Sequence, residues 1–144
     1  MECTVRWVGP QAGMSFIGES GTNHAVLMDG APESGGRNLG PRPMEMVLIG
    51  TGGCTAFAVV MILQKGRQAV SDCVVKLSAT RAETDPKVFT SIHFHFVVSG
   101  NKLSEASVER AVKLSHEKYC SASIMLAHSV SMTHSFEIID TAPI

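Results

Sequence analysis

The longest apolar stretch of this chain reads Met44-Glu45-Met46-Val47-Leu48-Ile49-Gly50-Thr51-Gly52-Gly53-Cys54-Thr55-Ala56-Phe57-Ala58-Val59-Val60-Met61-Ile62-Leu63-Gln64. Few of its side chains are polar, and they leave no polar face on a helix. A helix that is apolar nearly all the way round belongs in the interior of a larger structure. Pro43 suits the first position of such a helix, and Gly66 can end it. We therefore predict a long buried central helix over residues 44–64.

Three glycines, Gly50, Gly52 and Gly53, weaken this helix just before Cys54. Each costs about 1 kcal/mol of helix stability relative to alanine. Glycine permits a close approach of the backbone to its neighbours. We therefore expect these residues to allow close packing against another helix or to leave room beside Cys54.

Alternation of polar and apolar residues predicts strands on both sides of the helix. The strands are expected at 4–8, 14–19, 24–28, 73–84, 88–99 and 127–139, with a second helix from 104 towards 118 and a helical turn at 122–126. Residues 31–40 are rich in glycine and proline and form a long loop, a kind of segment that is often functional. This order of elements predicts an α+β fold with an antiparallel sheet.

The size and charge of the chain limit its class. Its 144 residues predict a single domain, 1–144, that is large enough for one core. A formal net charge of -1 favours neither nucleic-acid nor membrane partners. Residues 1–7 do not resemble a signal peptide, and the unbroken apolar run 56–63 is too short to span a bilayer. We therefore expect a cytoplasmic protein.

The cysteines are the candidates for chemistry, at positions Cys3, Cys54, Cys73 and Cys120. Their spacing matches neither a zinc motif nor a Cys-x-x-Cys pair, so redox or nucleophilic use is left open. Cys3 and Cys73 have no chemical neighbours in the sequence and are interpreted as ordinary residues.

Cys54 and Cys120 are more informative together than apart. Cys54 alone is typical of a small core residue. Cys120 follows His116 by four positions, so both side chains are expected on one helical face, where a nearby cation would lower the pKa of the thiol. Two thiols on two helices can also meet, so that peroxide oxidises one to a sulfenic acid and the other converts it to a disulfide.

The candidate charge partners lie before or at the start of the central helix. Glu45 is near Cys54 in sequence and can orient a cation above the thiol, or it can interact with the positive end of the helix. Arg6, Arg37 or Arg42 can supply that cation, although a surface charge is favoured for Arg37.

Two pairs of histidines are candidate metal ligands. His93 and His95 share a face of one predicted strand, and His128 and His134 share a face of another. Neither pair has a third ligand that the sequence identifies. A polar strand face is favoured, and no metal is predicted.

Two motifs carry a family resemblance: Gly40-Pro41-Arg42-Pro43-Met44-Glu45-Met46-Val47-Leu48, which leads to Gly52-Gly53-Cys54, and Glu117-Lys118-Tyr119-Cys120 after a helix. With them, almost the whole chain resembles the family of osmotically inducible protein C and organic hydroperoxide resistance protein, OsmC/Ohr. It is most similar to a branch whose loop before the helix reads Gly-Pro-x-Pro-Met-Glu. The resemblance implies an intertwined homodimer, with sheets wrapped around two central helices and active sites at the subunit interface.

The resemblance also implies the chemistry. Cys54 would be the peroxidatic thiol and Cys120 the resolving thiol in the reduction of small organic hydroperoxides. No bound cofactor is expected, because an external dithiol would recycle the protein. Glu45 and Arg42 are the candidate carboxylate and cation of this site.

Two positions depart from the family's peroxidases. Their carboxylate directly follows the proline that opens the helix, where this chain has Met44 and carries the acidic Glu45 one residue later. Their first hairpin contains an arginine, whereas residues 9–16 contain none. A thiol without a cation is mostly protonated at neutral pH. The alternative function is therefore a dimeric module that binds an apolar small molecule or senses redox state, with little or no turnover.

Overall fold

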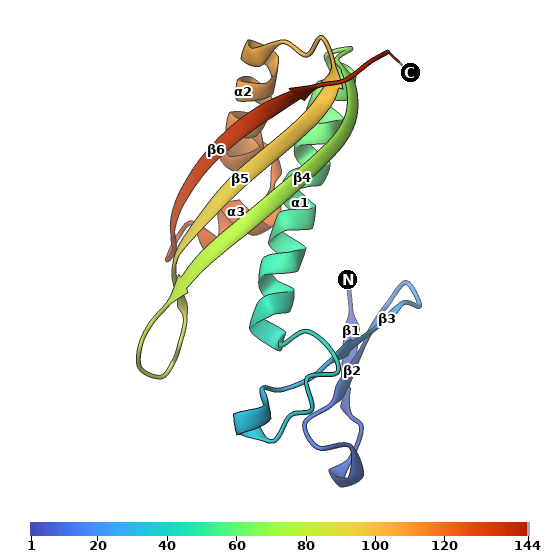
Figure 1. Cartoon of the computed structure of the whole chain (residues 1–144). Helices are drawn as coiled ribbons and strands as arrows, with labels where there is room; N and C mark the ends of the chain where they lie inside the picture. The colour runs from blue at the N-terminus through green and yellow to red at the C-terminus, as the bar shows by residue number, and fades with distance from the viewer. Residues whose placement is uncertain (144) are drawn as a thin grey trace. The chain divides into compact units, whose positions relative to one another are not determined.

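A computed structural model describes residues 1–143, which fall in two compact units, 1–49 and 50–143. The elements are β1 (Cys3–Trp7), β2 (Phe16–Ser20), β3 (Ala25–Met28), α1 (Pro43–Lys65), β4 (Ala69–Arg81), β5 (Phe89–Asn101), α2 (Glu105–Leu114), η3 (Ser115–Tyr119), α3 (Ser121–Leu126) and β6 (Ser131–Asp140), as labelled in Figure 1. The α+β class and the predicted element order are confirmed. One domain over 1–144 stays a prediction.

The first unit is an antiparallel meander in the order β1-β2-β3, followed by the predicted long loop. The loop contains one short 3₁₀ turn, Pro32–Ser34, and is held by a single buried carboxylate, that of Asp29. This carboxylate accepts backbone N–H bonds from Gly30, Arg37 and Leu39 at 2.7, 3.3 and 3.2 Å. The loop before α1 is therefore organised around one side chain.

The pKa of the Asp29 carboxyl also reflects its role as the anchor of this loop. Burial raises its pKa, but hydrogen bonds from Gly30, Leu39, Arg37 and Ser15 together lower the pKa by more than burial raises it. The pKa therefore lies below the ordinary 3.8. A carboxyl whose pKa is lowered by folding stabilises the folded state above its ordinary pKa. It loses that effect as the pH falls through the folded value.

We expect Asp29→Asn to loosen the loop, because an amide nitrogen replaces one acceptor and faces N–H groups. Amide hydrogen exchange at Arg37 and Leu39 should become faster by roughly an order of magnitude at neutral pH. Glu33→Gln, a charge-matched change at an exposed position of the same loop, should leave both rates unchanged. Equal rates in the Asp29 variant and the wild type would refute the anchor.

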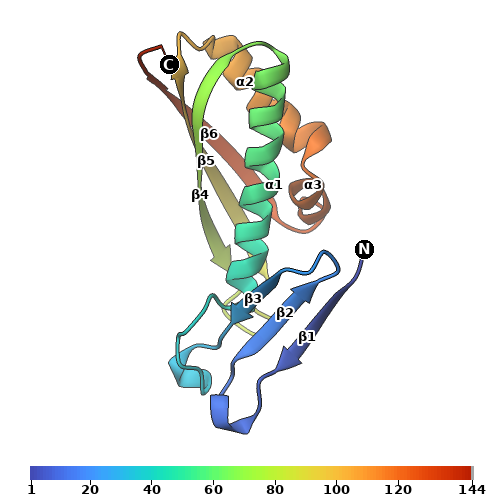
Figure 2. The ribbon, with the colours of Figure 1, turned by 90° about the vertical axis from the view of Figure 1, so that its right-hand side faces the viewer.

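The second unit is a three-stranded sheet with helices on one face, which Figure 2 shows from the side. Along β5, Phe94, Phe96 and Val98 are fully buried, while His93 and His95 alternate with them and are half-buried. This alternation is the strand periodicity that the sequence predicts. The core therefore lies between the helices and the β4-β5-β6 sheet.

One strand pairing differs from the prediction. β4 and β5 are antiparallel, but β5 and β6 pair in parallel, from Ser91↔Ser131 to Gly100↔Asp140. The physical reason is the connection, because α2, η3 and α3 together form a crossover long enough to bring β6 back in the same direction. The antiparallel prediction is confirmed for the other pairs and wrong for this one.

The glycines of α1 divide into two kinds. A Cβ added at Gly52 would lie 2.7 Å from Leu77 Cδ1, so this glycine brings the helix close to β4. The predicted close packing is therefore against the sheet and not against a helix of the same chain. A Cβ at Gly50 or Gly53 would meet nothing within 4 Å.

α1 is buried along one side only. Six of its residues are buried, namely Thr51, Gly52, Thr55, Ala58, Val59 and Leu63. On the other side Phe57 is 73% exposed and Ile49 57% exposed. The helix has 23 residues and contains an 18-residue stretch with a mean hydropathy of 2.2, so by length and composition it could cross a membrane. The prediction that the apolar run 56–63 is too short to span a bilayer does not extend to the whole helix. The side buried on the sheet is that of a core helix.

Candidate functional site

The second unit brings Cys54 and Cys120 together. Cys54 lies on α1 and is half-buried, and Cys120 lies between η3 and α3 and is fully buried. Both are free thiols, and Cys54 is a neighbour whose presence raises the pKa of the Cys120 thiol. The two cysteines are 66 residues apart in the chain, since 120 minus 54 is 66, so only the folded chain makes them neighbours.

A π-helical turn positions Cys120. After α2 the chain widens into η3, and the Cys120 N–H donates to the Ser115 carbonyl at 2.7 Å, five residues back. Cys120 then caps α3, where its sulfur accepts the Ser123 N–H at 3.4 Å. Single π-helical turns often lie at functional sites. This one carries the cysteine directly at its end.

The two thiols differ in their surroundings. Burial raises the pKa of the Cys120 thiol, hydrogen bonds from Ser123 lower it, and the neighbouring Cys54 raises it again, with a net rise. Cys120 is therefore protonated at neutral pH. The more exposed Cys54 is the thiol that a small molecule reaches first.

His116 does not serve as the expected cationic partner of Cys120. Its ring packs edge-on against Phe94 with centroids 4.7 Å apart and stacks on His134 at 5.1 Å. Burial and the neighbouring His134 lower the pKa of His116 to about 4, so the ring is neutral at pH 7. Cys120 does not share a helical face with His116, because Cys120 has left the helix with an extended backbone, φ -83° and ψ 99°, and caps α3.

Glu45 and Arg42 are paired at the start of α1. The Arg42 backbone N–H donates to Glu45 Oε1 at 2.9 Å, so the carboxylate satisfies a free donor at the end of the helix. This contact fits the alternative interpretation of Glu45 as a helix-end group. Both residues belong to the first unit, and their roles beside Cys54 stay predictions.

Arg37 is exposed, as expected, but it is not a free surface charge. Its Nη2 donates to the Gln11 carbonyl in the turn between β1 and β2. An arginine from the long loop therefore lies at the hairpin whose own residues 9–16 contain none.

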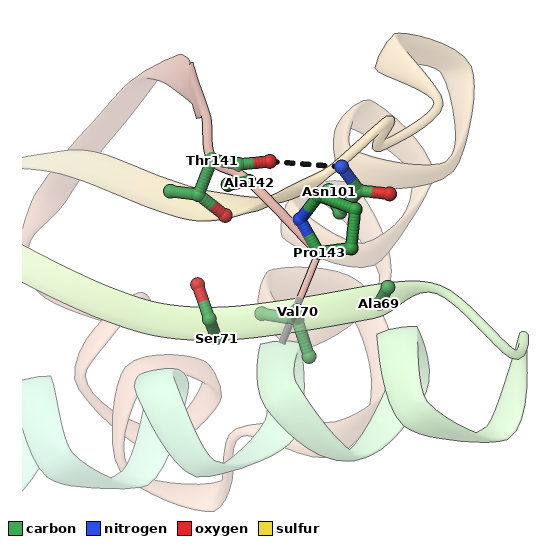
Figure 3. A pocket seen from close by; sticks show the side chains of 7 residues that line it. All are labelled: Ala69, Val70, Ser71, Asn101, Thr141, Ala142 and Pro143. Atoms are coloured by element: carbon green, nitrogen blue, oxygen red, sulfur yellow. Dashed lines mark hydrogen bonds between the residues drawn. The ribbon is translucent and has the colours of Figure 1, made fainter.

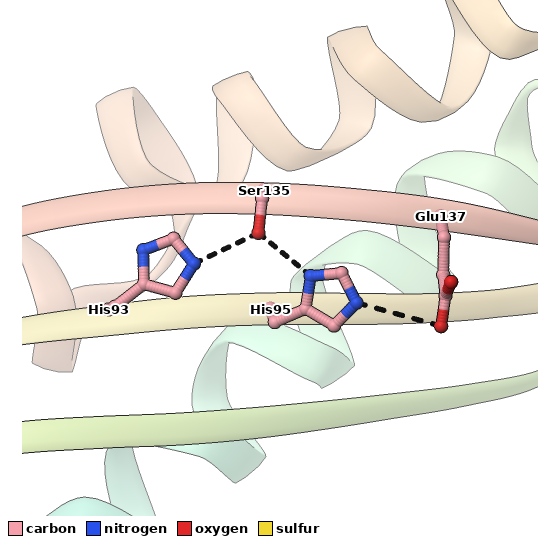
Figure 4. Close-up of polar contacts among 4 residues, drawn as sticks. All are labelled: His93, His95, Ser135 and Glu137. Carbon is pink, nitrogen blue, oxygen red and sulfur yellow. Dashed lines mark hydrogen bonds and ion pairs between the residues drawn. The ribbon is translucent and has the colours of Figure 1, made fainter.

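The histidines of β5 form a polar strip on the outer face of the sheet (Figure 4). Ser135 contacts His93 Nε2 at 2.9 Å and His95 Nδ1 at 2.7 Å, and His95 Nε2 lies 3.6 Å from Glu137. Residues 1–143 contain no group of three or more His, Cys, Asp or Glu that could hold a metal ion. The shared face of His93 and His95 is confirmed. His128 precedes β6, so its predicted place on that strand is wrong.

The linings of two cavities in the second unit show whether either cavity lies near the thiol pair. One, of about 260 Å³, is drawn in Figure 3 and is lined by Ala69, Val70, Ser71, Asn101, Thr141, Ala142 and Pro143. Its lining has no titratable side chain, and Asn101 Nδ2 donates to the Thr141 carbonyl at 2.8 Å. The other, of about 270 Å³, is lined by Met61, Ile62, Lys65, Gly66, Arg110, Leu114 and Tyr119. Only this second cavity includes a neighbour of Cys120, namely Tyr119.

Comparison with known proteins decides the family. A family model described as OsmC-like protein matches residues 35–135. Protein YhfA of Escherichia coli strain K12 is 52% identical over 139 residues, which are 96% of this chain and 98% of that protein. The chain belongs to the OsmC-like family. The resemblance stated from the sequence is confirmed.

Solved structures share the OsmC-like fold. A hypothetical protein from Aquifex aeolicus is 30% identical and has a TM-score of 0.82, over 98% of this chain and 97% of that chain. An organic hydroperoxide resistance protein OsmC from Legionella pneumophila is 16% identical and has a TM-score of 0.68, over 95% and 97%. At 16% identity the likeness shows the fold alone.

Several features around the thiols were not predicted from the sequence. The π-helical turn has no sequence signature, and the buried hydrogen bond between Thr55 and Ser115 joins residues 60 positions apart. The one available signal was the position of Thr55, a hydroxyl in a largely apolar helix directly after Cys54.

Proposed function

We propose that this OsmC-like chain reduces organic hydroperoxides with thiols, with Cys54 as the peroxidatic cysteine and Cys120 as the resolving cysteine. The observation that carries the proposal is the contact between a half-buried thiol and a fully buried, protonated one. The organic hydroperoxide resistance protein among the structural neighbours is consistent with this substrate class.

The chemistry balances in three steps. The Cys54 thiolate attacks the terminal oxygen of ROOH, the O–O bond breaks, and the alkoxide leaves as ROH after protonation, which leaves Cys54 as a sulfenic acid. The Cys120 sulfur then attacks the Cys54 sulfur, a disulfide forms and water leaves. An external dithiol reduces the disulfide by exchange and returns both thiols.

Other residues have roles under this proposal. Arg42 is the proposed cation that favours the thiolate form of Cys54, and Glu45 is the proposed carboxylate that orients this cation. The 270 Å³ cavity supports a substrate with an apolar body, because Met61, Ile62 and Leu114 lie in its lining. No bound cofactor takes part, and the cytoplasm, where dithiol reductants are kept reduced, is the proposed compartment.

The proposed assembly is a homodimer. The open side of α1 supports it, since Phe57 is exposed and Gly50 and Gly53 have open space above them. An apolar helix face with small residues can accept a second copy of the same helix at close range.

We expect Phe57→Lys to weaken the dimer by roughly a hundredfold, because it places a charge in an apolar interface. Analytical ultracentrifugation at micromolar concentration should show monomer. Val74→Lys is the matched control, since Val74 is 42% exposed on the sheet face away from the helices, and it should leave the mass unchanged. A Phe57 variant with the wild-type mass would remove this face from the interface.

The function is tested by consumption of cumene hydroperoxide in the presence of a dithiol. Turnover that depends on Cys54 supports the peroxidase. The alternative, a redox-sensing or binding module, predicts oxidation of the thiols without sustained turnover. It is motivated by the absence of arginine from residues 9–16.

A further inference from the structure

A buried hydrogen bond links the two segments that carry the cysteines. Thr55 directly follows Cys54 on α1, and Ser115 opens the π-helical turn that ends at Cys120. Both side chains are fully buried, and Thr55 Oγ1 lies 3.0 Å from Ser115 Oγ. The hydroxyl pair is therefore a direct bridge between the two thiol segments.

The direction of this hydrogen bond follows from the second contact of Ser115. Ser115 Oγ donates to the Val112 carbonyl at 2.8 Å, and a hydroxyl has one hydrogen. Thr55 is therefore the donor and Ser115 the acceptor. The bridge continues through the backbone, because the Ser115 carbonyl accepts the Cys120 N–H at 2.7 Å.

These contacts form a closed circuit. It runs from Cys54 to Thr55, across the hydroxyl pair to Ser115, through the π-helical turn to Cys120, and back through the contact of the two thiols. Because these contacts close a ring, each contact restricts the relative motion of the groups that the other contacts join. Intramolecular reaction of two thiols depends on how often they occupy reacting distance, which is their effective concentration.

We propose that Thr55 and Ser115 are positioning residues that raise the effective concentration of Cys120 at Cys54 and so favour the disulfide. The benefit of this positioning rests on the proposed function, but disulfide formation itself can be measured without any hydroperoxide. Neither hydroxyl is assigned contact with substrate.

The test is the equilibrium of the full-length protein with glutathione. Glutathione disulfide accepts two electrons from Cys54 and Cys120, and two glutathione thiols are released as the intramolecular disulfide forms. Mass spectrometry of the linked peptides measures the Cys54–Cys120 disulfide and distinguishes it from oxidation at Cys3 or Cys73. The equilibrium constant is the effective concentration of the pair.

Thr55→Val keeps the shape and removes the donor, and we expect it to lower the effective concentration roughly fivefold to tenfold. Ser115→Ala should lower it similarly, and Thr55→Ser, which keeps a hydroxyl, should recover most of the wild-type value. Val108→Ala, a fully buried position of α2, should lower the thermal midpoint while leaving the equilibrium constant unchanged.

Two results would overturn the inference. One is a wild-type equilibrium constant in both Thr55→Val and Ser115→Ala. The other is an equal fall of the equilibrium constant in Val108→Ala, which would mean that loss of stability alone shifts the equilibrium away from the disulfide. Absence of hydroperoxide turnover would instead contradict the proposed function. The glutathione equilibrium would still test the inference about Thr55 and Ser115.

Discussion

Cys54→Ser is expected to reduce consumption of cumene hydroperoxide to the uncatalysed background, a loss of roughly a hundredfold or more. A serine hydroxyl is almost never ionised at neutral pH and is a far weaker nucleophile towards a peroxide oxygen than a thiolate. The measurement is the steady-state rate with a dithiol as reductant.

The matched control for this prediction is Cys73→Ser. Cys73 is also half-buried, but burial and the neighbouring Asp72 raise the pKa of its thiol, which keeps it protonated at neutral pH. It should retain the wild-type rate. Turnover that survives in Cys54→Ser, or falls equally in Cys73→Ser, contradicts the assignment of the peroxidatic cysteine.

Cys120→Ser is expected to separate the two half-reactions. Cys54 should still reduce about one equivalent of hydroperoxide, because the first step needs only its own thiolate. The sulfenic acid should then accumulate, since the serine hydroxyl cannot resolve it, and turnover should fall roughly tenfold or more.

The trapped state is measured by mass spectrometry after one addition of hydroperoxide without reductant. Cys54 should carry one added oxygen in the Cys120 variant and none in the wild type, where the disulfide replaces it. A Cys120 variant with undiminished turnover and no sulfenic acid would show that another group resolves Cys54.

The central helix was predictable because its signal is local. Residues 44–64 are apolar on all sides, and the observed α1 differs from this range by one residue at each end. The second helix also begins where it was expected, and the Ser104 side chain caps it by accepting the Ser107 N–H at 3.2 Å. Local patterns of this kind do not depend on the rest of the fold.

Most of the errors concern long-range geometry. The direction of β6 depends on a crossover of three helical elements, which alternation within the strand does not reveal. The position of His116 depends on the extra width of the π-helical turn, and its neighbours Phe94 and His134 come from the sheet. The role of the Asp29 carboxylate as acceptor for a loop ten residues long also depends on the fold, because its partners Arg37 and Leu39 lie eight and ten residues later.

The thiol site was partly predictable for the same reason. The motif resemblance paired Cys54 with Cys120, and the fold places their side chains in contact. The asymmetry between them was beyond the sequence, because it arises from complete burial of Cys120 and from its hydrogen bonds at the start of α3.

The most direct test of the proposed chemistry is peptide mapping of the wild-type protein after one equivalent of cumene hydroperoxide in the absence of reductant. The proposal predicts one product, a disulfide between Cys54 and Cys120 within the same chain, formed with release of one equivalent of cumyl alcohol. Recovery of both cysteines as free thiols, or oxidation at Cys3 or Cys73 instead, would contradict it.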